Sequence, residues 1–160
     1  MYATHHDLSI STREAVVAIL SAHLIDAMDL FTQVKEAQWN VKGPNVTALH
    51  TVFRSMTRVI ARHCDAMANR IVALGGRAEA TARLVAARSS IDEFPHDTPA
   101  GLAYVSVIAG KLSQFGKAVR ASIVDTANCG DTVTADLLTQ ITSVNDQQLQ
   151  VLDAHLQVEN

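Results

Sequence analysis

Apolar residues recur at steps of three and four along four long stretches of the chain, a period that predicts amphipathic helices. The first stretch follows Ser11-Thr-Arg-Glu14, which fits a capping box, and it runs to about Asn40 before the turn residues Lys42-Gly43-Pro44. The second begins near Asn45 and ends at Gly75-Gly76, because glycine takes the left-handed position after a helix without a steric cost. These two helices have the predicted core positions Val16, Leu20, Leu24, Ala27, Phe31, Val34, Leu49, Val52, Phe53, Met56, Val59, Ile60, Met67, Ile71 and Leu74.

The second half of the chain predicts two further helices of similar length. Thr98-Pro99 fits an N-cap followed by proline at the first helical position, and Asn128-Cys129-Gly130 ends this third helix. Asp131 or Thr132 is expected to cap the fourth helix. The predicted core positions here are Leu102, Val105, Ile108, Leu112, Phe115, Val119, Ile123, Leu138, Ile141, Leu149, Leu152 and Leu156.

The connection between the second and third helices covers residues 77–97 and is long enough to cross a bundle at about 3.3 Å per residue. Ser90 to Phe94 are expected to form one short helical turn within it. The other two links are short, so the helices they join are antiparallel neighbours. The sequence therefore predicts an all-α, ferritin-like four-helix bundle with a long 2–3 crossover that carries a short helix. We expect one domain over residues 1–160, with a flexible N-terminal tail at 1–10.

Composition is that of a globular protein, with 48% apolar and 18% charged residues in 160. The formal charge of −3 gives no overall basic field to attract nucleic acid. Cys64 and Cys129 lack metal-type spacing and are expected to be free thiols of a reducing cytoplasm. No stretch of 18 apolar residues and no secretory h-region is present, so we expect neither a membrane helix nor a signal peptide.

Candidate chemistry is sparse inside the predicted bundle. The only Glu-x-x-His match, Glu93-Phe-Pro-His96, contains proline and lies in the connection, so we do not expect a di-iron site at the bundle centre. The second helix instead carries a polar arc with His50 and Asp65. These two residues are about 22 Å apart along the helix axis and cannot share a site within one chain. They would meet if two copies of the helix packed antiparallel about a twofold axis; the alternative is a solvated helix edge.

Three segments resemble one family closely: 35–44 (KEAQWNVKGP) with Ala48-Leu-His50, 63–76 (HCDAMANRIVALGG) and 149–157 (LQVLDAHLQ). They are similar to the Dps family of mini-ferritins, the DNA-protection proteins of starved bacteria. The resemblance implies four-helix bundles with a short extra helix, assembled as hollow homo-dodecamers with tetrahedral symmetry. It also implies Fe(II) oxidation, preferably with hydrogen peroxide, storage of ferric iron, frequent DNA binding, and a cytoplasmic location with nucleoid association. The ferroxidase centre of the family lies between twofold-related subunits.

Three of the five metal-ligand positions implied by this resemblance are substituted. His50 and Asp65 are retained, but Gln38 replaces the usual His, Arg54 the usual Asp and Asn69 the usual Glu. A guanidinium has no lone pair for a metal, and amide oxygens are weaker iron ligands than imidazole and carboxylate. We expect Arg54 either to pair with the partner's Asp65 in place of the metal or to point into the cavity without a role.

Two further implied features concern cation entry and DNA. Asp131 and Asp136 match acidic positions that line the threefold pores of the resembling family, although Asp131 would also serve as a helix cap. Family members that bind DNA often use a basic tail, but no Lys or Arg precedes Arg13 and none follows Arg120. DNA binding is therefore expected to be weak or absent, because phosphate neutralisation supplies most non-specific affinity.

These observations predict a cytoplasmic cage that binds and stores iron and protects against oxidative stress, with a non-standard or degraded ferroxidase centre. Iron is the expected metal, and the centre either still holds it or has lost it. The retained ligands His50 and Asp65, alone or with another histidine, would carry any ferroxidase activity. The alternative is a catalytically silent structural or DNA-shielding cage, or a partner subunit of an active paralogue.

Overall fold

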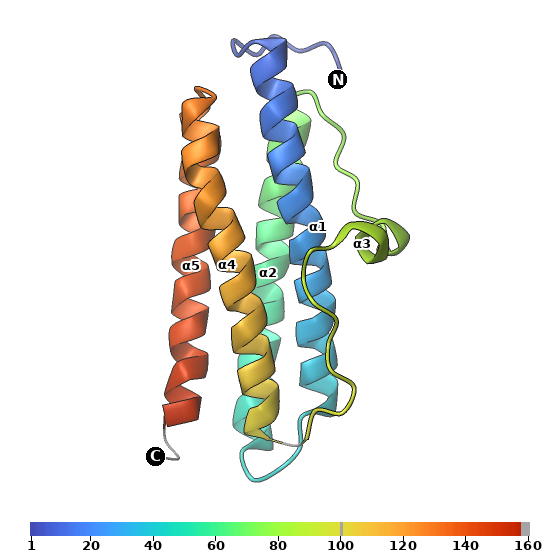
Figure 1. Cartoon of the computed structure of the whole chain (residues 1–160), viewed down its shortest axis with the longest axis vertical. Coiled ribbons are helices and arrows are strands. Elements are labelled where there is room, and N and C mark those ends of the chain that lie inside the picture. The colour runs from blue at the N-terminus through green and yellow to red at the C-terminus, as the bar shows by residue number, and fades with distance from the viewer. Residues whose placement is uncertain (100, 158–160) are drawn as a thin grey trace.

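The computed structural model describes residues 1–99 and 101–157, and it forms a four-helix bundle. The long helices are α1 (Ile10–Asn40), α2 (Val46–Ala73), α4 (Leu102–Asn128) and α5 (Thr132–Gln157). A short helix, α3 (Ala82–Arg88), lies in the connection that runs from the end of α2 along the outside of α1 to the start of α4 (Figure 1). The predicted ferritin-like architecture with one long crossover is thereby confirmed.

The core lies between the four long helices, where α1 packs mainly on α2 and α4 mainly on α5. The largest fully buried side chains come from all four: Leu20, Leu30, Leu49, Phe53, Met56, Met67, Ile71, Ile108, Leu112, Phe115 and Leu138. By length and composition α1 would also pass as a membrane-spanning helix. Its apolar stripe is instead the centre of this core, since Val16, Leu20 and Leu30 are fully buried by the neighbouring helices.

The predicted capping box at Ser11 is wrong, because Ser9 caps α1. The Ser9 hydroxyl accepts a hydrogen bond from the Thr12 N–H at 3.1 Å. The side chain of Arg13 fixes this start, since its buried guanidinium donates to the carbonyls of Leu8 and Leu74. A contact with the end of α2 therefore selects one serine over the other.

The N-terminal residues also contact the end of α2, since Tyr2 N–H donates to Gly75 O at 2.6 Å. The flexibility expected for residues 1–10 stays a prediction.

The predicted start of the third helix at Thr98-Pro99 is also wrong, because α4 begins at Leu102 after Gly101, whose φ is +71°. The Thr98 hydroxyl and N–H both donate to Pro95 O, so this residue closes a turn instead of capping the helix. By contrast, the glycine end of α2 is as expected: Gly75 has a φ of +83°, and Gly76 N–H donates to Ile71 O.

The short helix of the crossover lies at Ala82–Arg88, whereas the expected turn at Ser90–Phe94 is not helical. Side chains from α1 and α4 bind the backbone of this segment. Asp26 accepts from the N–H and hydroxyl of Ser90, both at 2.7 Å, and Lys111 donates to the carbonyls of Asp92 and Glu93. These bonds hold the segment extended against the bundle, because its polar groups are satisfied without a helical turn.

Candidate functional site

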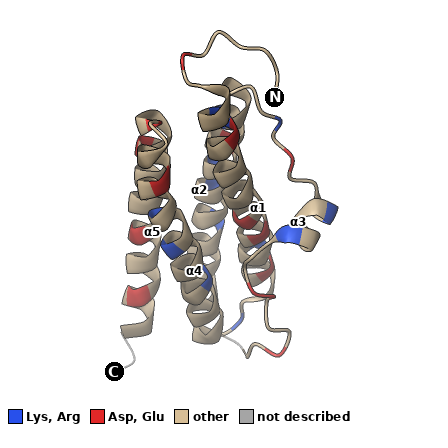
Figure 2. Cartoon of the chain, turned by 45° about the horizontal axis from the view of Figure 1, so that its top comes forward, with Lys and Arg blue, Asp and Glu red and all other residues tan. Residues whose placement is uncertain are grey.

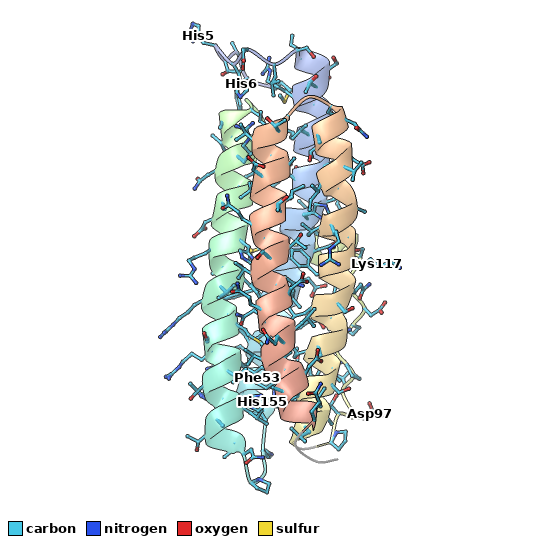
Figure 3. The ribbon with its side chains drawn as sticks, turned by 90° about the vertical axis from the view of Figure 1, so that its left-hand side faces the viewer. His5, His6, Phe53, Asp97, Lys117 and His155 are labelled. Carbon is cyan, nitrogen blue, oxygen red and sulfur yellow. The ribbon has the colours of Figure 1, made fainter. Side chains whose placement is uncertain are left out.

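The polar arc predicted on the second helix lies on the outer face of α2. His50, Arg54, Asp65 and Asn69 all have exposed side chains in the single chain. Figure 3 shows long side chains of α2 extending away from the bundle, whereas Phe53 on the same helix is fully buried. The helix therefore has one face in the core and a second, polar face that this chain leaves open.

The structure brings only two of the five predicted metal-centre residues together. Gln38 Nε2 at the end of α1 lies 3.5 Å from His50 Nε2 near the start of α2. Asp65 lies about four turns further along α2. Within residues 1–99 and 101–157, no three His, Cys, Asp or Glu side chains gather as a metal-binding group. A complete centre would therefore need a second copy of the chain.

Lys35 belongs to this site, although sequence reasoning missed it. Its ammonium donates to Gln38 Oε1 at 3.1 Å and lies 5.4 Å from the centroid of the Trp39 ring. The Gln38 side chain is buried, whereas Trp39 is 70% exposed. Lys35 and Gln38 are three residues apart on one helix, a spacing that places two side chains on the same face. That spacing was the available sequence signal.

Three other histidines, His23, His63 and His155, are hydrogen-bonded or partly buried, and in the described part of the chain none of them belongs to a group of three potential metal ligands. His23 Nε2 lies 2.8 Å from Ser122 Oγ, and burial lowers the pKa of His23 despite the opposing charge of Asp26. Burial and the charge of Arg62 lower the pKa of His63 to about 4. The Val151 carbonyl lies 2.8 Å from His155 Nδ1. His23 and His63 are therefore neutral at pH 7.

Both cysteines are free thiols, as expected. Cys64 is buried, and burial, with a smaller contribution from the Asp65 charge, raises the pKa of its thiol to about 12. A thiol with so high a pKa is protonated at neutral pH and is a poor nucleophile or metal ligand.

The two predicted pore carboxylates have different surroundings. Asp131 is buried and caps α5: it accepts from the Thr134 N–H at 2.9 Å and hydroxyl at 2.6 Å, and both its oxygens bind Arg70 Nη2. Burial alone would raise the pKa of Asp131, but the Thr134 bonds and the Arg70 guanidinium outweigh it and hold the pKa below 3.8. Asp136 is exposed in a groove between α2 and α5, which Asn69 also lines.

Charges of both signs are interspersed over the helices (Figure 2). Arg120 pairs with Asp146 at 2.7 Å across α4 and α5, and both side chains are more than half exposed. On α2, Arg54, Arg58 and Arg62 are exposed at successive turns. The outer face of α2 therefore carries a row of three guanidinium groups, of which Arg54 stands at a predicted ligand position.

The comparison with known proteins agrees with the architecture. A model of the ferritin-like domain matches residues 17–160. The DNA protection during starvation protein of Agrobacterium fabrum is 29% identical over 156 residues, 98% of this chain and 96% of that protein. The DNA protection during starvation protein 2 of Bacillus anthracis is 30% identical over 142 residues, 88% of this chain and 96% of that protein.

Solved structures show the same fold. The Dps of Mycobacterium smegmatis in its tetragonal form superposes with a TM-score of 0.92 at 23% identity, over 98% of this chain and 94% of that chain. DpsC from Streptomyces coelicolor gives a TM-score of 0.90 at 22% identity, over 98% and 90%. Together with the domain match and the relatives of near-equal length, these likenesses show that the chain belongs to the Dps family within the ferritin-like superfamily.

Proposed function

We propose that this chain forms a homo-dodecameric cage that holds iron and limits oxidative damage in the bacterial cytoplasm, and that its intersubunit oxidation centre is degraded. The contact between Gln38 and His50 at the end of α1 supports the proposal that the oxidation centre is degraded. There the Gln38 amide nitrogen lies 3.5 Å from His50 Nε2, the ring atom of a retained ligand, and Lys35 binds the amide oxygen.

The donor set does not fit Fe(II). Two amides and a guanidinium stand at three of the five positions, which leaves only His50 and Asp65 as ligands of the usual kind. Arg54 adds a fixed positive charge that cannot be removed by deprotonation. The Arg54 guanidinium would repel an iron ion bound at the same centre. The site therefore disfavours the metal that it would need to oxidise.

One twofold axis pairs the four predicted centre positions of α2 with one another. With two copies of α2 antiparallel and the axis at the level of positions 59 and 60, Arg54 lies opposite the partner's Asp65 and His50 lies opposite the partner's Asn69. The planar guanidinium matches a carboxylate in two parallel hydrogen bonds, so Arg54 neutralises a carboxylate that would otherwise be buried alone. In this arrangement an ion pair replaces the metal at the interface.

The assembly can be measured directly. Light scattering or native mass spectrometry at micromolar concentration should give a particle of about twelve times the 17.2 kDa chain mass. The open polar face of α2 and the exposed Trp39 are the surfaces that this assembly would cover. A stable monomer, or a dimer that does not assemble further, would contradict the cage.

DNA binding is proposed to be weak. The chain has no Lys or Arg before Arg13 or after Arg120, and each subunit adds a formal charge of −3 to the cage. Phosphate contacts supply most non-specific affinity, so gel shifts at neutral pH, about 0.15 M salt and with a chelator should show little retention. The chelator removes divalent cations that could bridge the acidic shell to phosphate. Tight, salt-sensitive retention under these conditions would refute the proposal.

A further inference from the structure

A short hydrogen-bonded chain links Lys35, Gln38 and His50 at the junction of α1 and α2. The Lys35 ammonium donates to Gln38 Oε1 at 3.1 Å, and Gln38 Nε2 lies 3.5 Å from His50 Nε2. Gln38 is only 6% exposed, so water has little access to its amide. The order of donors and acceptors along these three side chains determines which ligand atoms the site offers to a cation.

The ammonium determines which end of the Gln38 amide faces His50. A carboxamide has one end that accepts and one that donates, whereas an ammonium only donates. Turning the amide over would place its NH2 group against the Lys35 ammonium, two donors with no acceptor between them. Lys35 therefore holds the oxygen on its own side and leaves the NH2 group toward the imidazole.

The state of His50 follows from this orientation. A ring nitrogen that faces an amide N–H acts as the acceptor, so in neutral His50 the proton lies on Nδ1 and the Nε2 lone pair points at Gln38. An imidazole binds a metal through the same lone pair. Both potential ligand atoms therefore already have a hydrogen-bond partner: Gln38 Oε1 accepts from Lys35, and His50 Nε2 accepts from Gln38.

Lys35 is itself held in place. Its side chain is half-buried, and its ammonium lies 5.4 Å from the centroid of the Trp39 ring, within the range of a cation–π attraction. Direct charge repulsion by Lys35 would also disfavour metal binding, but it would act whatever residue occupied position 38. The two effects can be separated by changing both positions.

We propose that Lys35 is a positioning residue that excludes divalent cations by fixing the Gln38 amide with its NH2 group toward His50. This inference rests on the proposed degraded centre and names the group that keeps the retained histidine from a metal. The change Lys35→Met removes the ammonium but keeps the length of the stem, so the amide can turn over and offer its oxygen beside a free His50 Nε2.

The test uses the assembled protein and Co2+ as the probe. Calorimetry should show that Lys35→Met raises the affinity for Co2+ at least about tenfold, the lower end of the effect of outer-shell partners on metal sites. Visible absorption should report a nitrogen ligand, and that signal should disappear with His50→Ala. Lys117→Met, at an exposed lysine on α4 (Figure 3), is the matched control and should leave the affinity unchanged. Lys35→Gln serves the same purpose if the methionine variant does not assemble.

A double-mutant cycle identifies the mechanism. In a Gln38→Leu background, Lys35→Met should change the Co2+ affinity less than about twofold, because there is no amide left to orient. The same gain in both backgrounds would overturn the proposal in favour of direct repulsion, and no gain in either would overturn it outright. A fast native ferroxidase would refute the proposed function instead, so the two failures are distinguishable.

Discussion

The triple variant Gln38→His, Arg54→Asp and Asn69→Glu should oxidise Fe(II) with hydrogen peroxide at least about tenfold faster than the native cage. Outer-shell partners alone change metal affinity or activity by about 10- to 100-fold, and these three changes alter the ligands themselves. The three changes supply an imidazole and two carboxylates beside the retained His50 and Asp65. They also remove the Arg54 charge that repels the metal. The initial rate, followed by the near-ultraviolet absorbance of the ferric product, measures the effect.

The changes should work together and much less well one at a time. Arg54→Asp alone leaves the Gln38 amide turned toward His50, so the imidazole remains engaged. Arg58→Asp, one turn further along the exposed face of α2, is the matched control for Arg54→Asp: it makes the same charge change but supplies no ligand at a centre position. An equal gain from Arg58→Asp would show that general electrostatics, and not a rebuilt ligand set, controls the rate.

The second large effect concerns the start of α5. Asp131→Ala should lower the free energy of unfolding by about 3 kcal/mol, because it leaves the Arg70 guanidinium without its buried partner and removes the helix cap. The Asp131 side chain is 1% exposed and that of Arg70 15%. Chemical denaturation at pH 7 and fixed protein concentration measures the loss. Asp146→Ala, which breaks the exposed pair with Arg120, is the control and should cost about 1 kcal/mol or less.

The Asp131 contribution should depend on pH in a defined direction. Its pKa in the folded chain lies below the ordinary value of 3.8, so the unfolded chain takes up the proton first as the pH falls. The stabilisation is therefore complete above about pH 5 and is lost as the pH falls below 3.8 and through the lowered pKa. Equal costs for Asp131→Ala and Asp146→Ala at pH 7 would contradict the structural role of the buried pair.

The four long helices were predictable because their signals are local. The three- and four-residue spacing of apolar side chains and the glycines after α2 depend on neighbours in sequence. The start of α1 could not be predicted in this way, because Arg13 selects Ser9 through a contact with Leu74, which is 61 residues away. The helical turn expected at Ser90–Phe94 within the crossover was wrong for the same reason: Asp26 and Lys111 bind the backbone of this segment from other helices, and no local pattern encodes such bonds.

The candidate site was predictable in outline. The spacing of His50 and Asp65 showed that one chain cannot bring them together, which left either a contact between two copies or a solvated helix edge. The family resemblance listed Gln38 and His50 among the ligand positions, and the structure has Gln38 Nε2 at 3.5 Å from His50 Nε2. The resemblance gave no reason to consider Lys35, because it is not one of the five ligand positions. Similarly, Asp131 was recognised as a cap, but its partner Arg70 comes from a different helix and could be assigned only once the two helices were packed.

We propose that the native twofold centre does not hold iron. This can be tested with crystals of the native cage that are soaked with Fe(II) without oxygen and measured at the iron absorption edge. We expect no anomalous peak between His50 and the partner's Asp65, with the Arg54 guanidinium at the carboxylate, whatever iron is bound elsewhere in the cavity. A strong peak within ligand distance of His50 or Asp65 would contradict the account, because a non-standard ligand set would then bind the metal.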